Sequence, residues 1–302
     1  MKRRRGLAAL SAIALTLTGI MATAVPASAH DSGNSRVSVT LKGNGSTAWV
    51  SNDVVNAGAV RLSVTGSASA GAQVVVVGLQ HGATIGHFLH DLSIVVMESN
   101  PPAKVATAMT DIERIAVAYG GGDTLPGRSV RDTIVLPRHG TYYITNVTPN
   151  GTAVSLGRLK VRGHADEVRV PDYSATVTLG QGSHDVISVS RHLPEWGTIR
   201  VRNNGDMIHL LQITPVAKGV TDAQVQAEYN QILAGKKPTS DPAGLNTPPS
   251  RLVGSDAVSP GHTAYLTYSL PAGTYLLQCF VPDTTTGLPH TFMGMHKVVV
   301  IH

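Results

Sequence analysis

The C-terminal segment groups side chains of the kinds that bind metal ions. The single cysteine, Cys279, ends a strand-like run, and His290 and Met295 stand between a turn-rich stretch and the last run of the chain. Upstream, His209 begins an apolar run directly after a turn signal at residues 203–205. Thiolate, imidazole and thioether groups are ligands of soft and borderline metals. Each residue alone also fits ordinary packing, with Cys279 as a small buried hydrophobe and Met295 as a gap filler.

In this order the four residues resemble the metal motif of the cupredoxins, the blue copper family, which has one His on an early strand and then Cys, His and Met around the last loop. The resemblance implies one copper per chain, held by His209, Cys279, His290 and Met295, with His290 the more exposed imidazole. Such a set suits both Cu(I) and Cu(II), whereas structural zinc sites use four Cys or His ligands. It further implies an electron-transfer protein with a redox partner that the sequence does not identify.

The spacing of the motif is unusual for a small electron carrier. Ten residues separate Cys279 from His290, which is more similar to the extended ligand loop of the copper nitrite reductases. Both Met293 and Met295 follow His290. We favour Met295 as the axial ligand because a strand begins directly after it, as in the family.

Two enzyme classes built from cupredoxin domains are disfavoured. Multicopper oxidases need His-x-His motifs, including a His beside the copper-binding Cys, and nitrite reductases also need a His at that position. Here Gln278 and Phe280 flank Cys279, and the sequence contains no His-x-His. The sequence therefore favours an electron carrier over an enzyme, without deciding whether the protein has an enzymatic activity.

Two other functions stay open. A mature N-terminus at His30 could chelate copper through its amine and imidazole, as in histidine-brace proteins or a copper carrier. Alternatively, the chain is an extracellular β-sandwich binding module whose metal site is vestigial or unloaded.

The N-terminus predicts export. A basic head at residues 2–5, an apolar run over residues 7–22 and a small-x-small site at residues 27–29 have the layout of a signal peptide cleaved after Ala29. The route, Sec or Tat, stays open. Four of the 24 Lys and Arg lie in this segment, so the net charge of +5 falls to +1 for residues 30–302. We therefore expect a secreted protein with no nucleic-acid footprint and no integral membrane segment after the signal is removed.

The elements that must position the ligands are short β-strands. Runs of four to eight residues punctuated by Gly, Pro, Asn and Asp predict a β-sandwich or barrel. The predicted strands include Arg36–Leu41, Val60–Val64, Gln73–Leu79, Asp132–Leu136, Thr141–Val147, Ala175–Leu179, Asp185–Ser190, Thr198–Val201, His209–Ile213, Ala264–Leu270, Thr274–Phe280 and Lys297–Ile301.

The two halves of the chain are similar to one another. Residues 126–147 align with residues 260–280 through shared Pro-Gly, Leu-Pro and Gly-Thr-Tyr steps. The prediction is an all-β chain of two tandem cupredoxin-like Greek-key β-sandwich domains, residues 30–164 without copper and residues 165–302 with it, joined near residues 163–166. Asn146 stands where the second half has Cys279, so the first half cannot hold a thiolate site.

Three further features have predicted places. Capping signals at Thr110 and Thr221 predict one short helical insertion in each half. Residues 235–261 read as a long loop over one end of the second sandwich, of unassigned role. His81, His87 and His90 form a group that is either a loose second metal site or surface histidines, the latter being favoured.

Overall fold

A computed structural model describes residues 35–97, 99–165, 168–182, 184–236, 241, 244–245 and 249–302. The predicted signal peptide and His30 lie outside these residues. The elements, in chain order, are β1 (Ser35–Lys42), β2 (Thr47–Val50), β3 (Val54–Asn56), β4 (Gly58–Thr65), β5 (Ala72–Leu79), α1 (Ile85–Val96), α2 (Pro102–Ile115), β6 (Ala116–Thr124), β7 (Ser129–Leu136), β8 (Arg138–Val147), β9 (Ala153–His164), β10 (Ala175–Gly182), β11 (His184–Val189), β12 (Trp196–Gly205), β13 (His209–Pro215), α3 (Asp222–Leu233), β14 (Val253–Val258), β15 (Thr263–Ser269), β16 (Gly273–Gln278), η1 (His290–Met293) and β17 (His296–Ile301).

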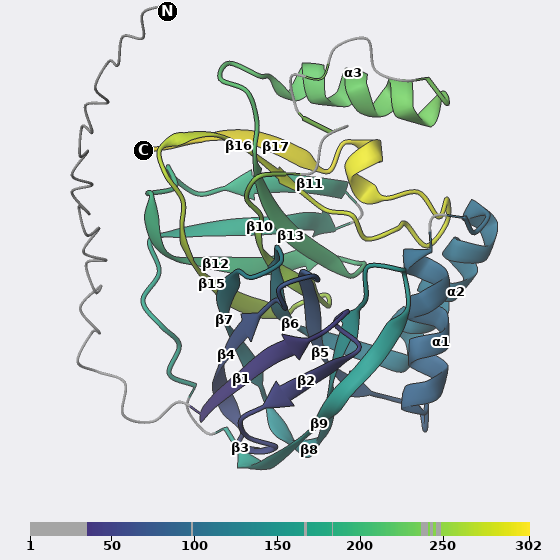
Figure 1. Ribbon diagram of the computed structural model, residues 1–302, viewed down its shortest axis with the longest axis vertical. Helices are drawn as coiled ribbons and strands as arrows, with labels where there is room; N and C mark the ends of the chain where they lie inside the picture. Colours follow the sequence, from purple (N-terminus) through teal and green to yellow (C-terminus); the bar gives the residue numbers. More distant parts are fainter. Residues whose placement is uncertain are drawn as a thin grey trace, which may run out of the picture. The chain divides into compact units, whose positions relative to one another are not determined.

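The strands form two mixed sheets, and each sheet runs across both halves of the chain (Figure 1). The 8-stranded sheet has the order β11-β10-β12-β15-β7-β4-β1-β2, and the 9-stranded sheet has the order β17-β16-β13-β14-β6-β5-β8-β9-β3. In both halves one early strand pairs in parallel, β1 with β4 and β10 with β12. The predicted all-β sandwich fold is confirmed.

Two antiparallel pairings form the seam between the halves. In the 8-stranded sheet β15 pairs with β7, with Ala264 opposite Ile134. In the 9-stranded sheet β14 pairs with β6, with Gly254 opposite Asp123. Residues Asn34–His302 therefore make one compact unit.

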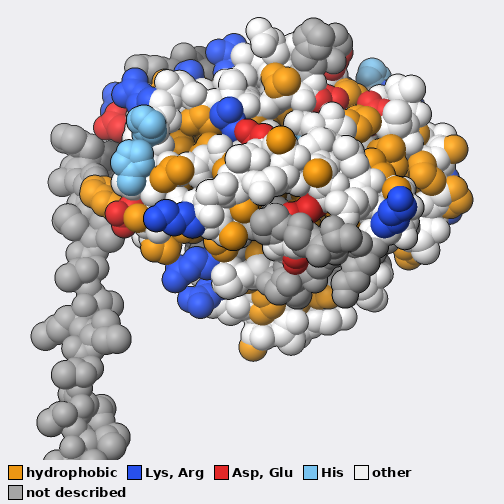
Figure 2. All heavy atoms as spheres, turned by 90° about the horizontal axis from the view of Figure 1, so that it is seen from above, with side chains coloured by type: hydrophobic (Ala, Val, Ile, Leu, Met, Phe, Trp, Pro, Cys, Tyr) orange, Lys and Arg blue, Asp and Glu red, His pale blue; other side chains and the backbone are white. Residues whose placement is uncertain are grey.

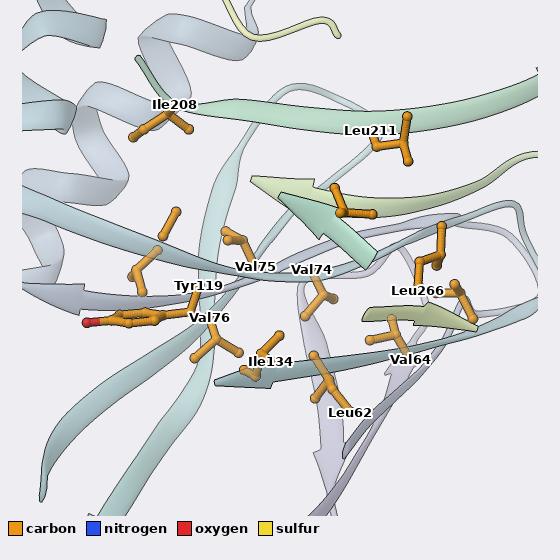
Figure 3. Packing of buried hydrophobic residues seen from close by; sticks show 14 of the residues in the cluster. Leu62, Val64, Val74, Val75, Val76, Tyr119, Ile134, Ile208, Leu211 and Leu266 are labelled. Atoms are coloured by element: carbon orange, nitrogen blue, oxygen red, sulfur yellow. The ribbon is translucent and has the colours of Figure 1, made fainter. Parts of the chain in front are cut away.

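The core between the sheets is continuous and aliphatic. Alternate residues of each strand point inward, as the period of two requires. Leu62, Val74 and Ile134 from the first half and Leu211 and Leu266 from the second half are almost completely buried in the same cluster (Figure 3). Because this core is shared, it holds strands of both halves at fixed positions relative to the metal-binding candidates.

The predicted strands all correspond to observed strands, but the prediction for residues 235–261 was wrong in part. Residues Val253–Val258 of that segment are β14, which lies between β13 and β6 in the sheet. Gly254, Ser255 and Asp256 hide the strand in the sequence, and pairing on both edges forms it nevertheless. Several residues between 237 and 248 lie outside the described part of the chain.

The helical prediction was correct at Thr221 and wrong at Thr110. Thr221 caps α3 with a capping box to Gln224. Thr110 instead lies inside α2, where its hydroxyl donates to the Ala106 carbonyl. The first half also contains two helices rather than one, since Thr84 caps α1 and accepts from the His87 N–H.

The surface seen in Figure 2 is mostly uncharged, with basic and acidic side chains in small separate groups. Among the described residues no helix is both long enough and apolar enough to span a membrane.

Candidate metal centre

Three neighbouring strands of the 9-stranded sheet bring the predicted ligands together at one end of the strands. The neighbouring strands β17, β16 and β13 are antiparallel. The start of β13, the end of β16 and the start of β17 therefore lie side by side. His209 is the first residue of β13, Cys279 directly follows β16, His290 opens η1 and Met295 directly precedes β17. All four residues are 0% exposed.

The donor atoms of three of these residues surround a common point. His209 Nδ1 lies 3.2 Å from His290 Nδ1, and Cys279 Sγ lies 3.8 Å from His209 Nδ1 and 3.7 Å from His290 Nδ1. The circumradius of this triangle is about 2.1 Å, close to the metal–nitrogen distance of ~2.0–2.1 Å and metal–sulfur distance of ~2.3 Å in protein sites. The three residues therefore fit a trigonal metal centre.

The two imidazoles are poised to be neutral ligands. Burial lowers the pKa of His209 to about 3 and that of His290 to about 4, so both rings are uncharged at neutral pH. The expectation that His290 is the more exposed ring was wrong. The loop that contains His290 folds back over the ends of the strands, and His290 is as completely buried as His209.

A carboxylate lies on the outer side of both rings. The Asp185 carboxylate on β11 lies 3.6 Å from His209 Nε2 and 3.8 Å from His290 Nε2, and both of these buried nitrogens lack a hydrogen bond within the structure. A neutral ring carries one proton, and a nearby carboxylate favours that proton on Nε2. The lone pair on each Nδ1 is then directed toward Cys279.

The thiol of Cys279 is held by backbone amides. Its sulfur accepts from the Leu210 N–H at 3.4 Å and from the Val281 N–H. Burial raises the pKa of the thiol to about 12, so without a metal it stays protonated at neutral pH. A bound cation reverses that preference, because coordination deprotonates a thiol.

The two candidate axial methionines have different surroundings. Met295 is 0% exposed and its backbone carbonyl accepts from the Cys279 N–H at 3.3 Å. Met293 is 39% exposed, and the Thr286 hydroxyl lies 3.5 Å from its sulfur. The burial of Met295 beside Cys279 favours it over Met293.

Glycines allow the His209 ring to sit against the backbone. A Cβ built at Gly205 would lie 2.6 Å from His209 Nε2, and one built at Gly180 would lie 2.9 Å from it. The Asn203 side chain orders the turn before His209 by donating to the Met207 carbonyl and accepting from the Gly205 N–H. The turn predicted at residues 203–205 was wrong in position, because these residues end β12 and the bend lies at residues 206–207. The fit of the ring against Gly205 was not predicted.

A tight turn explains how ten residues fit between Cys279 and His290. The Asp283 carboxylate accepts from the backbone N–H groups of Thr285 and Thr286. Pro282 and Pro289 then form a bridge that closes the turn. The His290 N–H bonds to the Val281 carbonyl at 2.9 Å, which returns the imidazole to the thiol.

Helix α2 of the first half contacts two segments that carry ligands, the residue before His209 and the loop between Cys279 and His290. Glu113 Oε1 accepts from the N–H of Ile208, the residue before His209, at 2.7 Å. The Thr110 hydroxyl lies 3.3 Å from the Thr284 carbonyl in the ligand loop. Neither contact was predictable from sequence, because both join residues about 100 or more positions apart.

The residue beside the thiol has a structural role. Gln278 is buried, and its Oε1 accepts from the Tyr229 hydroxyl of α3 at 2.6 Å. The residue directly before Cys279 is thus an amide that anchors α3.

Comparisons with known proteins give only distant similarities. No protein-family model and no curated protein matches the chain. Auracyanin B is 20% identical, covering 44% of this chain and 91% of its own, with a TM-score of 0.27. Auracyanin from Roseiflexus castenholzii is 22% identical, covering 43% of this chain and 99% of its own, with a TM-score of 0.25. A multicopper oxidase is 12% identical, covering 88% of each chain, with a TM-score of 0.24. These scores assign no function, so the proposal below depends on the side chains of this chain.

Proposed function

We propose that this chain is a secreted mononuclear copper protein that transfers electrons, with one copper held by His209, Cys279, His290 and Met295. The observation that carries the proposal is the buried triangle of two Nδ1 atoms and one Sγ atom around a point about 2.1 Å from each. A thiolate with two imidazoles and a weak thioether is the donor set of blue-copper electron-transfer sites.

Each side chain has a defined task in this proposal. Copper, when bound, supplies a one-electron couple between Cu(I) and Cu(II). His209 and His290 would bind the metal through Nδ1, with the Asp185 carboxylate 3.6 Å and 3.8 Å from their Nε2 atoms. Cys279 is the thiolate and Met295 the weak axial donor. Complete burial of the ligands excludes water, and the backbone bonds to the thiol keep its position fixed, so little rearrangement accompanies a change of charge.

The proposal favours a carrier over a copper enzyme. Gln278, beside Cys279, is engaged with Tyr229 and offers no imidazole to pass an electron to a second copper. We further propose that residues 30–164 and 165–302 are duplicated domains, that residues 1–29 are a cleaved signal, and that the electron donor or acceptor is a separate redox protein.

The test is the visible absorption spectrum of the Cu(II)-loaded protein and its variants. Wild type is expected to bind one copper and to show a strong thiolate-to-copper charge-transfer band. Cys279→Ser should lose that band. Met295→Leu should keep it with a shifted reduction potential, because the axial ligand tunes the potential.

Met293→Leu is the matched control for the axial position, and its potential and spectrum should equal those of wild type. A band that survives in Cys279→Ser would contradict the proposed ligand set. Copper bound without the band would indicate the His30 amine or other histidines, and no bound copper would favour the binding-module alternative.

A further inference from the structure

The helical hairpin of the first half contains a second group of metal-binding side chains. His87 and Asp91 are four residues apart on α1, so they lie on one face of the helix. Asp111 on α2 completes the group, since α1 and α2 pack together (Figure 1). His87 thus meets two carboxylates in place of the neighbouring histidines considered from the sequence.

The donor atoms are close enough to share one ion. His87 Nε2 lies 2.7 Å from Asp111 Oδ2 and 3.2 Å from Asp91 Oδ2. All three ligand atoms lie within 4.8 Å of one another. Zinc in proteins lies ~2.0–2.1 Å from imidazole nitrogen and ~2.0–2.2 Å from carboxylate oxygen. Ligands of a tetrahedral zinc ion at those distances lie ~3.3–3.6 Å apart, so the 3.2 Å pair nearly fits and the 2.7 Å pair would open by less than ~1 Å on binding.

One carboxylate of the group is buried and incompletely satisfied. Asp91 is 7% exposed, and its Oδ2 makes no hydrogen bond, its close polar contact being the 3.2 Å ion pair with His87 Nε2. Burial raises the pKa of this carboxyl, the interaction with the Asp111 carboxyl adds to the rise, and the charges of His87 and His90 oppose it. A buried oxygen without a donor is costly in a folded protein, and a cation at this place would satisfy it.

The second carboxylate is oriented by a neighbouring guanidinium. Arg114 donates to Asp111 Oδ1 through Nε at 2.9 Å and also through Nη2. These bonds leave Asp111 Oδ2 directed at His87. Outer partners of this kind fix the orientation of ligands in metal sites.

Two of the three residues border an open hollow, and the third, His87, has a side chain that is 44% exposed. Asp91, Asp111 and Arg114 line an open hollow of about 740 Å³, together with Thr284 and Thr285 of the Cys279–His290 loop. The hollow leaves room for water molecules to complete the coordination of an ion, as in sites that keep an open position.

We propose that His87 Nε2, Asp91 Oδ2 and Asp111 Oδ2 form an exchangeable site for a divalent first-row transition metal such as Zn(II). This site uses none of the ligands of the Cys279 centre. One nitrogen and two oxygens make a borderline-hard donor set, unlike the soft set around Cys279. The inference does not depend on the function proposed above.

The test is a Zn(II) titration of the full-length protein, with bound zinc per chain measured by elemental analysis and affinity measured by competition with a chromophoric chelator. His87→Ala should lose one zinc equivalent, with affinity at that site reduced at least ~100-fold. Asp111→Asn, which keeps the shape of the side chain, should behave in the same way. Arg114→Gln should weaken binding ~10-fold, because it acts through the orientation of Asp111.

Two matched controls separate this site from others. His90→Ala removes a histidine from the same helix outside the group and should keep the zinc equivalent. Cys279→Ser disables the other centre and should keep it too. The proposal is overturned if His87→Ala and Asp111→Asn bind as much zinc as His90→Ala, or if Cys279→Ser alone abolishes binding.

A measurement on the unaltered protein covers variants that fail to fold. As Zn(II) is added, the NMR resonance of His87 Nε2 should shift at lower zinc concentration than the ring resonances of His90. An unperturbed His87 ring at saturating zinc would contradict the proposal.

Discussion

The two halves of the chain build the same local backbone around different side chains. In the second half the Leu210 N–H donates to Cys279 Sγ at 3.4 Å, and in the first half the Gln73 N–H donates to Asn146 Oδ1 at 2.9 Å. Cys279 and Asn146 each follow the shared Gly-Thr-Tyr step and are each 0% exposed. The same amide position therefore serves a thiol in one half and a side-chain amide in the other.

The tyrosine of that shared step has the same contact in both halves. Tyr275 donates to the Pro271 carbonyl at 2.8 Å, and Tyr142 donates to the Arg138 carbonyl at 3.0 Å. The scaffold around the two positions is thus alike, and the difference must come from the few side chains that face inward.

These inward-facing side chains and the length of one loop distinguish the candidate metal centre of the second half from the hydrogen-bonded Asn146 of the first half. The Asn146 amide also donates to the Gly45 carbonyl at 3.0 Å, so its polar atoms are satisfied by fixed bonds. Ala72, before Gln73, stands where the second half has His209. The first half passes from β8 to β9 through residues 148–152, whereas the longer passage from β16 to β17 contains His290 and Met295.

The largest expected effect comes from replacing Cys279 of the second half by asparagine, the residue at the equivalent position of the first half. Cys279→Asn should abolish the charge-transfer band and lower copper affinity at least ~100-fold, because the thiolate ligand is lost. The fold should persist, since the amide oxygen can accept from Leu210. Copper titration followed by visible absorption and circular dichroism measures both effects.

The reverse change, Asn146→Cys, is the control. It should create no coloured copper site, because Ala72 supplies no imidazole there. A blue site in this variant would show that the ligand set is less restrictive than the comparison implies.

The next effect tests the packing of His209. Gly205→Ala adds a methyl group whose built position lies 2.6 Å from His209 Nε2. We expect a loss of ~1–3 kcal/mol in the free energy of unfolding, as for other overpacked sites, together with weaker copper binding. Urea unfolding of the copper-free protein measures the first quantity.

Gly157→Ala, in β9 of the first half, is the matched control. Its added methyl would meet only Val50, at 4.0 Å. Equal destabilisation by the two variants would mean that the His209 contact has no special importance.

A smaller effect is expected where the first half supports the second. Glu113→Ala leaves the partly buried Ile208 N–H without its acceptor. The free energy of unfolding should fall by an amount at the lower end of the ~1–3 kcal/mol range for such losses. Copper should also dissociate faster, which stopped-flow chelation measures.

Glu113→Gln retains an acceptor oxygen and should recover most of the stability and the slow copper release. If Glu113→Ala releases copper at the wild-type rate, α2 does not support the centre.

The smallest effect concerns the seam, which belongs to both halves. Asp132 on β7 is buried, accepts from the Ser255 hydroxyl at 2.6 Å, and has its pKa raised to about 7 by burial. The folded protein then binds a proton that the unfolded chain has released, so stability falls as pH rises toward 7 and changes little above it. Between pH 6 and pH 8 this amounts to about 1 kcal/mol.

Asp132→Asn should remove that share of the pH dependence, whether or not copper is bound. Urea unfolding of both proteins at pH 6 and pH 8 measures it. An unchanged difference between the two pH values would show that Asp132 does not titrate in this range.

Alternation of apolar and polar residues was sufficient to predict strands whose side chains themselves mark two faces, such as β1. It failed for β14, where Gly254, Ser255 and Asp256 interrupt the pattern, and for the Gly-rich β6. Both strands lie at the seam, where partners on either side supply the pairing that propensity does not.

The start of α2 was missed although the signal was present. The helix begins at Pro102, and proline is favoured in the first helical turn, where no amide bond is lost. The capping pattern at Thr110 led us to predict that the helix begins there, but Thr110 lies inside α2.

The candidate ligands could be predicted because the single Cys, with His before it and His and Met after it, forms a chemically distinctive order. Asp185, Glu113 and Gly180 could not, since nothing local distinguishes them. Their importance comes from contacts that exist only once distant strands and a helix have packed.

Copper-edge X-ray absorption of the copper-loaded protein tests the central claim most directly. The account predicts one copper per chain with one sulfur and two nitrogen atoms at bonding distance, and loss of the sulfur in Cys279→Asn. A copper shell of nitrogen and oxygen atoms alone in the wild-type protein would contradict the assignment of Cys279, His209 and His290 as ligands.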